Sequence, residues 1–112
     1  MKSLVYIVTE NWWPPGKSEE VGKLTLDALQ KFPGDLSIAK FVVQGAVWPE
    51  KDGMHSISIS SIEPGKVKEV MDIAYNQELL LSKNIEGWRF EIHIAYDLIE
   101  AMPLVGLKAP EA

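Results

Sequence analysis

The spacing of hydrophobic residues along the chain predicts where its helices and strands lie. Two stretches, 18–32 and 65–83, carry apolar residues three or four positions apart, which places them on one side of a helix. Other stretches show either a short β-branched run or alternation of apolar and polar residues, both typical of strands. These predicted strands are residues 4–8, 37–48, 54–62 and 88–96. The order along the chain is therefore β-α-β-β-α-β.

This order predicts an α+β domain with a ferredoxin-like fold, in which one antiparallel sheet carries both helices on one face. A chain of 112 residues has the size of a single domain. We assign residues 1–96 to this domain. Residues 97–112 form an apolar tail, which we expect to pack on its own sheet or on a partner subunit. The large apolar residues of the tail are Leu98, Ile99, Met102, Leu104, Val105 and Leu107.

Composition narrows the classes of partner. A net charge of -5 repels phosphate backbones, so we expect no nucleic-acid partner. The chain has no cysteine, which excludes disulfides, thiolate chemistry and iron–sulfur clusters. No stretch approaches the roughly 20 apolar residues of a membrane span, and the apolar run near the N-terminus is too short for a signal peptide. We therefore expect a cytoplasmic protein with no membrane partner.

The segment NWWPPGKS ends like a phosphate-binding loop, whose pattern is G-x-x-x-x-G-K-[ST]. Asn11 stands at the first glycine position, and the two prolines remove backbone donors that a phosphate cradle needs. We instead expect a stiff loop in which Ser18 caps the following helix. Its paired indoles, Trp12 and Trp13, would pack over the end of the sheet or form the rim of an apolar ligand pocket.

Alternation within the strands sorts their side chains onto two faces. In the third strand, the set that contains His55 and Ile57 is apolar, so we place it against the helices. The opposite face is either solvated, as is common in antiparallel sheets, or the wall of a cavity closed by a second subunit. We expect no stacking aromatics on it, in contrast to an RNA-binding sheet. This polar face would carry Ser56, Ser58, Arg89, Glu91 and His93.

Glu91 and His93 are the leading candidates for chemistry, because both leave the same face of one strand. A carboxylate beside a histidine raises its basicity, which suits a general base, and Arg89 would stabilise developing negative charge. The alternative is an ordinary polar role, in which Glu91 can equally pair with Arg89. Tyr6 would hydrogen-bond a ligand if it shares this face. The histidines lack metal-ligand spacing and the serines lack a nucleophile elbow, so we expect no metal and no cofactor.

The element order, the chain length and the run Trp13-Pro14-Pro15 after the first strand resemble the dimeric α/β-barrel superfamily. The closest likeness is to its small domains of unknown function, which have a similar aromatic-Pro-Pro loop, and it covers about residues 1–100. The resemblance implies two ferredoxin-like sheets paired into a barrel, often around an internal pocket. It also implies that Tyr6 and the polar-face residues line that pocket. Some members are cofactor-independent monooxygenases, and others are isomerases or lactone-processing enzymes. The apolar tail departs from this pattern.

These observations lead us to expect a homodimer, or a higher homo-oligomer, that binds a small and largely apolar molecule. If the protein is an enzyme, the residues favour proton abstraction or oxygenation without a cofactor. The alternative is a non-catalytic structural or regulatory oligomerisation module whose sheet face encloses no ligand.

Overall fold

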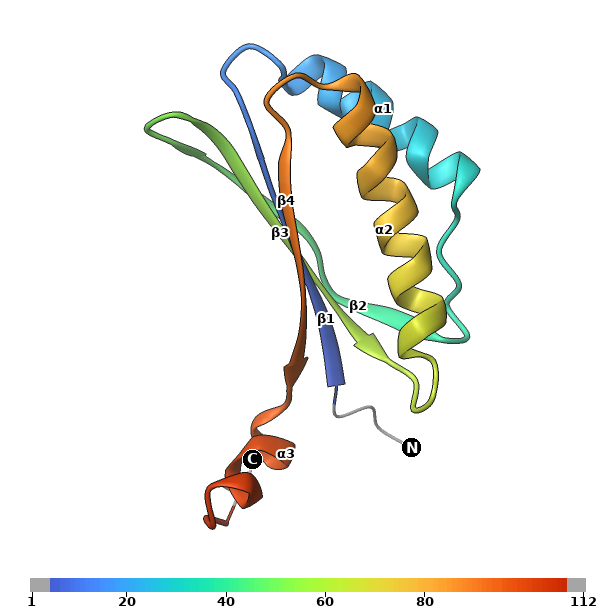
Figure 1. Ribbon diagram of the computed structural model, residues 1–112, viewed down its shortest axis with the longest axis vertical. Helices are drawn as coiled ribbons and strands as arrows, with labels where there is room; N and C mark the ends of the chain where they lie inside the picture. The colour runs from blue at the N-terminus through green and yellow to red at the C-terminus, as the bar shows by residue number, and fades with distance from the viewer. Residues whose placement is uncertain (1–4, 109–112) are drawn as a thin grey trace.

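Residues 5–108 fold into one antiparallel sheet and three helices (Figure 1). The structure is a computed structural model that describes residues 5–108, so residues 1–4 of the predicted domain and 109–112 of the predicted tail lie outside it. The α+β class is as predicted, and a third helix follows the predicted β-α-β-β-α-β order. The elements are β1 (Val5–Trp13), α1 (Ser18–Lys31), β2 (Ala39–Glu50), β3 (Gly53–Ile62), α2 (Val67–Asn84), β4 (Arg89–Tyr96) and α3 (Leu98–Leu104).

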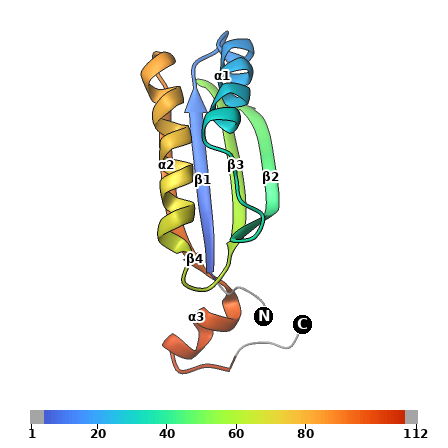
Figure 2. The ribbon, with the colours of Figure 1, turned by 90° about the vertical axis from the view of Figure 1, so that its right-hand side faces the viewer.

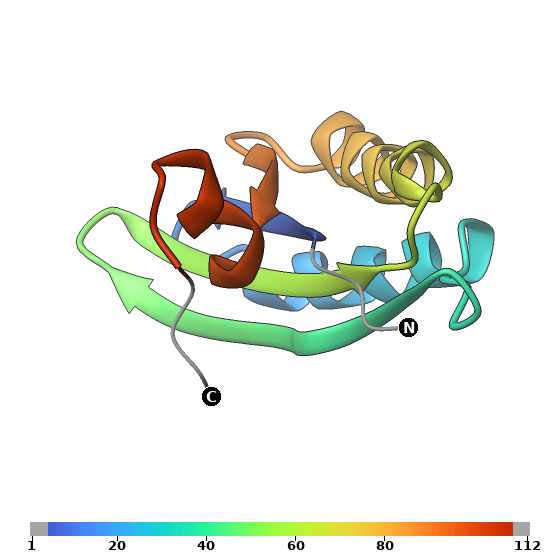
Figure 3. The ribbon, with the colours of Figure 1, turned by 90° about the horizontal axis from the view of Figure 1, so that it is seen from below.

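The strands lie in the order β2-β3-β1-β4, and every neighbouring pair is antiparallel. Helices α1 and α2 lie side by side on one face of the sheet, the helix face (Figure 2). No helix within residues 5–108 lies across the opposite face, the open face (Figures 1 and 3). Helix α3 lies beyond the end of β4 (Figures 1 and 2). In the same part of the chain, no helix is long and apolar enough to cross a membrane.

Two hydrophobic clusters fill the space between the helices and the sheet. The first lies near the α1 end of β1, where Trp13 and Trp88 stack with ring centroids 5.6 Å apart. Val21, Leu81 and Ile85 complete this cluster. The second cluster lies toward the other end of the sheet and consists of Ile7, Ile62 and Val70. Burial of these residues on one side only leaves the open face without a covering layer.

Strand β1 continues through the tryptophans, which the sequence placed on a loop. Trp12 pairs with His55 of β3 and with Arg89 of β4, so backbone pairing on both sides keeps the chain extended. The loop prediction is therefore wrong for both indoles. Because successive side chains alternate, Trp13 enters the core and Trp12 lies on the open face. The predicted Ser18 cap is also wrong: Ser18 begins α1, and its Oγ accepts a hydrogen bond from Trp13 Nε1 over 3.0 Å.

Candidate functional site

Strand register determines which side chains share the open face, because residues paired directly across strands point the same way. The open face carries Arg89, Glu91, His93 and Ala95 from β4, Tyr6, Val8, Glu10 and Trp12 from β1, His55, Ile57, Ile59 and Ser61 from β3, and Lys40, Val43, Ala46 and Trp48 from β2. Arg89, Glu91 and His93 thus lie on the face opposite α1 and α2, as expected, and Tyr6 shares that face.

The prediction for β3 is reversed. Ser56 and Ser58 share the helix face with Ile62, which is buried under α2, while His55 and Ile57 lie on the open face. Ser56 Oγ is 3.2 Å from the side-chain amide of Asn11, and Ser58 lines a small cavity of about 100 Å³ beside α2. The two serines are therefore separated by the sheet from the β4 residues with which they were grouped.

A single row of side chains crosses all four strands at one end of the open face. It consists of Arg89 on β4, Trp12 on β1, His55 on β3 and Trp48 on β2, and we call it the cross-strand row. The guanidinium carbon of Arg89 lies 4.8 Å from the centre of the Trp12 ring. The His55 ring lies between the indoles, with centroids 4.4 Å from Trp12 and 4.3 Å from Trp48. The expectation that the open face lacks aromatics is therefore wrong.

His55 is buried, with 9% of its surface exposed, and both of its ring nitrogens contact carboxylates. Nε2 is 2.8 Å from Glu10 Oε2, and Nδ1 is 3.0 Å from Glu50 Oε2. Burial favours the neutral ring, but the hydrogen bonds to Glu50 and then Glu10 outweigh it and raise the pKa of His55. In return, the bond to His55 lowers the pKa of Glu50. Two acceptors on two nitrogens suit the imidazolium, in which both nitrogens donate.

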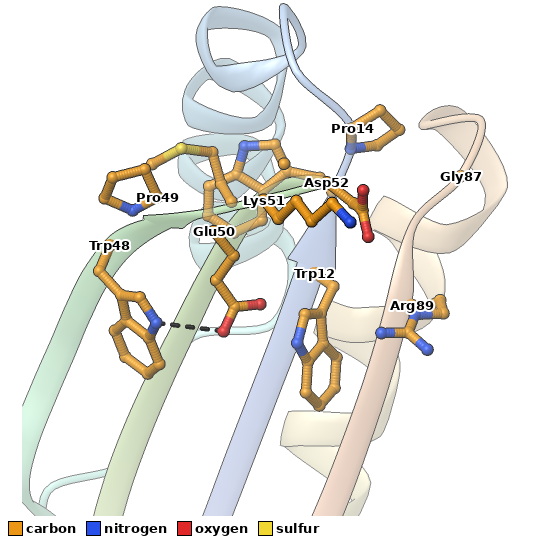
Figure 4. A pocket seen from close by; sticks show the side chains of 12 residues that line it. Trp12, Pro14, Trp48, Pro49, Glu50, Lys51, Asp52, Gly87 and Arg89 are labelled. Atoms are coloured by element: carbon orange, nitrogen blue, oxygen red, sulfur yellow. Dashed lines mark hydrogen bonds between the residues drawn. The ribbon is translucent and has the colours of Figure 1, made fainter.

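A cavity of about 800 Å³ opens at the same end of the sheet (Figure 4). Trp12 and Trp48 form two of its walls, and Glu50 lies between them in the view (Figure 4). Arg89 and Lys51 also line this cavity, together with Pro14. It combines indole surface with charged groups of both signs, which is suited to orienting a small molecule. Trp13 reaches this cavity from the core side, so the predicted role of both indoles as a pocket rim stays open.

Glu91 and His93 contact each other on the open face, where Glu91 Oε1 is 3.1 Å from His93 Nε2. Both side chains are about half exposed. Arg89 makes no ion pair with Glu91 and lies over Trp12 instead. Tyr6 donates a hydrogen bond to Asp97 Oδ2 over 2.5 Å, and this bond raises the pKa of Tyr6. Tyr6 therefore links the open face to the start of α3.

Glu78 is a buried acid that the sequence-based predictions did not include. It lies on α2 facing the core and is only 7% exposed. Burial raises its pKa to about 7, although the Trp88 indole N–H partly opposes this by favouring the carboxylate. With the Asn11 amide turned so that Nδ2 faces the acid, Asn11 donates to Glu78 and accepts from Ser56 Oγ. Ser56, Asn11 and Glu78 are thus linked by hydrogen bonds on the helix face of the sheet.

Within residues 5–108, no three acidic or histidine side chains are grouped as metal ligands. His55 is the histidine with two carboxylates nearby, and both of its nitrogens are taken by them.

Comparison with known proteins yields a likeness in shape only. No protein-family model matches the chain, and no curated protein matches it. Among solved structures, the de novo designed protein Foldit4 is 11% identical, with 86% of this chain and 99% of that chain covered and a TM-score of 0.49. A REP-associated tyrosine transposase bound to a REP hairpin is 12% identical, with 94% of this chain and 64% of that chain covered and a TM-score of 0.38. Similarity at this level carries no argument about function.

Proposed function

We propose that the chain forms a cytoplasmic homodimer in which two ferredoxin-like subunits stack their open faces into an α/β barrel. The barrel would enclose a chamber for a small, largely apolar molecule, as the resemblance to the dimeric α/β-barrel superfamily implies. One observation carries the proposal: the open face has an aliphatic centre that no helix of residues 5–108 covers. Its members are Val8, Val43, Ile57 and Ile59. These side chains are partly exposed, and a partner that covered them would remove their remaining apolar surface from water, which favours association.

Helix α3 supports association from a second direction. It lies beyond the end of the sheet, displaced toward the open-face side (Figure 1), and it buries none of its own residues. Its start is held in place, since Asp97 accepts hydrogen bonds from Ile99 N over 3.0 Å and from Tyr6. The exposed apolar side chains of this segment are Leu98, Ile99, Leu104, Val105 and Leu107. A second subunit is the surface that they fit best.

The Glu91–His93 pair would give the chamber a base. In the single chain both groups are exposed, and a second sheet stacked over them would exclude water and strengthen their 3.1 Å contact. A carboxylate that orients the imidazole favours proton abstraction from a bound molecule. Arg89 lies on the same strand and face, where it would stabilise the negative charge that forms.

Sedimentation equilibrium tests the dimer. The wild-type chain should be dimeric at micromolar concentration, and Ile59→Asp should make it monomeric because it places a charge in the aliphatic centre. Ile94→Asp is the matched control: Ile94 lies on the same sheet but on the other face, is 54% exposed, and should leave the dimer intact. Circular dichroism would establish that both variants are folded. A monomeric wild type would overturn the proposal.

Thermal-shift screening of the dimer against a metabolite library tests the chamber, since a ligand selective for the folded state raises the melting temperature. A compound that stabilises the wild type should stabilise Ile59→Asp much less. If it is also turned over, His93→Ala should abolish turnover while the fold persists. A dimer that no compound stabilises would support the structural or regulatory module instead.

A further inference from the structure

The cross-strand row ends in complementary groups on the two edge strands of the sheet. At the β4 edge, Arg89 covers one side of Trp12, is otherwise exposed, and forms no ion pair within residues 5–108. At the β2 edge, Trp48 packs one side against His55 and stays 37% exposed. Cationic and indole groups thus alternate along the row. One end presents an exposed guanidinium, and the other presents a partly exposed indole.

We propose that in the homodimer Arg89 of each subunit stacks on Trp48 of the partner subunit, which joins the two cross-strand rows. The inference rests on the proposed homodimer and selects one of the ways in which its sheets can stack. A two-fold axis parallel to the strands places β4 of one subunit opposite β2 of the other and keeps both rows at the same height. A two-fold axis across the strands would instead set β4 opposite β4 and separate the rows.

The chemistry of the two ends fits this contact. An arginine guanidinium is planar and weakly hydrated, so it stacks on indole faces, which lysine does less well. Arg89 is the only arginine of the chain. Glu50 Oε2 lies 3.3 Å from Trp48 Nε1, so a carboxylate stands beside the indole and attracts an approaching cation. Within its own subunit, Arg89 lies over Trp12 and its charge helps to lower the pKa of Glu50, yet its side chain stays exposed, so stacking on the partner subunit would add a second π-face and a second carboxylate.

The same two-fold arrangement sets β1 of one subunit opposite β3 of the other. Val8 and Ile59 are paired neighbours in one sheet, so the rotation places Val8 of each subunit opposite Ile59 of the other subunit. The aliphatic centres then face each other across the proposed chamber, at the level below the rows. One stacking geometry therefore accounts for both the charged ends and the apolar middle of the open face.

A mixing experiment tests the contact. Arg89→Gln and Trp48→Leu each spoil both contacts of their own homodimer, and each should weaken dimerisation roughly tenfold. In a heterodimer of the two variants, both substitutions fall in the same contact, and the other contact keeps its arginine and its tryptophan. Native mass spectrometry of an equimolar mixture should therefore show heterodimers above the half expected by chance. The control partner is Phe41→Leu, which changes a β2 aromatic that is 53% exposed on the helix face. Its mixture with Arg89→Gln should show half.

The possible outcomes test the Arg89–Trp48 contact and the proposed homodimer separately. Heterodimers at half of the population, with a dimeric wild type, would overturn the Arg89–Trp48 contact and leave the proposed homodimer standing. A monomeric wild type would remove both. An excess of heterodimer that also appears with Phe41→Leu would show that the preference does not depend on Trp48 and would overturn the contact as well.

Discussion

Replacing Glu78 by glutamine should make the protein more stable at alkaline pH and abolish part of its pH dependence. Glu78 is buried, and its pKa is about 7 in the folded chain against 4.5 for an ordinary glutamate. A group whose pKa is raised on folding contributes stability below its unfolded pKa and loses that contribution as pH rises through its folded pKa. At about 1.4 kcal/mol per pKa unit, the loss between pH 4.5 and 7 amounts to about 3 kcal/mol. The glutamine side chain cannot ionise, so the variant avoids this loss.

The assay is urea denaturation of the wild type and Glu78→Gln at several pH values, followed by tryptophan fluorescence, to which the buried Trp13 and Trp88 stack contributes. The two free energies of unfolding should agree near pH 4.5 and diverge by about 3 kcal/mol at pH 8. Other titrating groups are common to both proteins and cancel in the difference. Glu69→Gln, on the exposed side of the same helix, should follow the wild type. Parallel curves for the wild type and Glu78→Gln would refute the reasoning.

Three further predictions concern the open face, the β2–β3 hairpin and helix α1. Because the pKa of His55 is raised on folding, its stabilising contribution is full below about pH 6.5 and is lost as pH rises through the folded pKa. His55→Gln should therefore lower the free energy of unfolding at pH 6 and change it little at pH 9, as measured by urea denaturation. Gly53→Ala should lower stability by roughly 1–3 kcal/mol, because Gly53 has a φ of 146° and an added Cβ would meet the carbonyl oxygen of Trp13. Gly22→Ala, in an open position of α1, should raise the melting temperature instead, since alanine favours a helix by up to about 1 kcal/mol.

Local periodicity was sufficient to predict the element order, because each helix and strand is amphipathic over its own length. Helix α2 shows both the strength and the limit of this signal. Val70 and Leu81 belong to the apolar residues that recur at helical spacing, and both are buried. Glu78 falls on the same stripe, three positions before Leu81, yet its charge led to its omission. The 3.6-residue period alone places Glu78 inside, whatever its charge.

The side of the sheet that a strand presents to the helices depends on pairing between strands, which the sequence of one strand does not contain. In β3 one alternating set consists mainly of serines and the other mainly of isoleucines. Hydrophobicity alone therefore assigned the isoleucine set to the helix face, which is wrong. Ile62 settles it: the residue is almost fully buried, and residues an even number of positions away, such as Ser58, share its face. In β2, register shifts between Phe41 and Ala46 also break the alternation. The cross-strand row could not be predicted for the same reason, since its members come from four separate segments that only strand pairing brings together.

The titrating groups on either side of β1 act together on the stability of this end of the sheet. Glu10 and Asn11 are consecutive, so they point to opposite faces, and one contacts His55 while the other contacts Glu78. The pKa values of His55 and Glu78 are both raised, and each therefore contributes stability that is lost as pH rises. Glu50 acts in the opposite sense, because its lowered pKa gives stability that is present above pH 4.5 and lost as pH falls. The contact between His55 and Glu50 is thus strongest between about pH 4.5 and 6.5, where the Glu50 carboxylate and the His55 imidazolium coexist, while the stability that Glu78 contributes already falls across this range. If the partner subunit stacks on Trp48 through Arg89, dimerisation should share this optimum, because the contact depends on the same ordered indole and the same carboxylate.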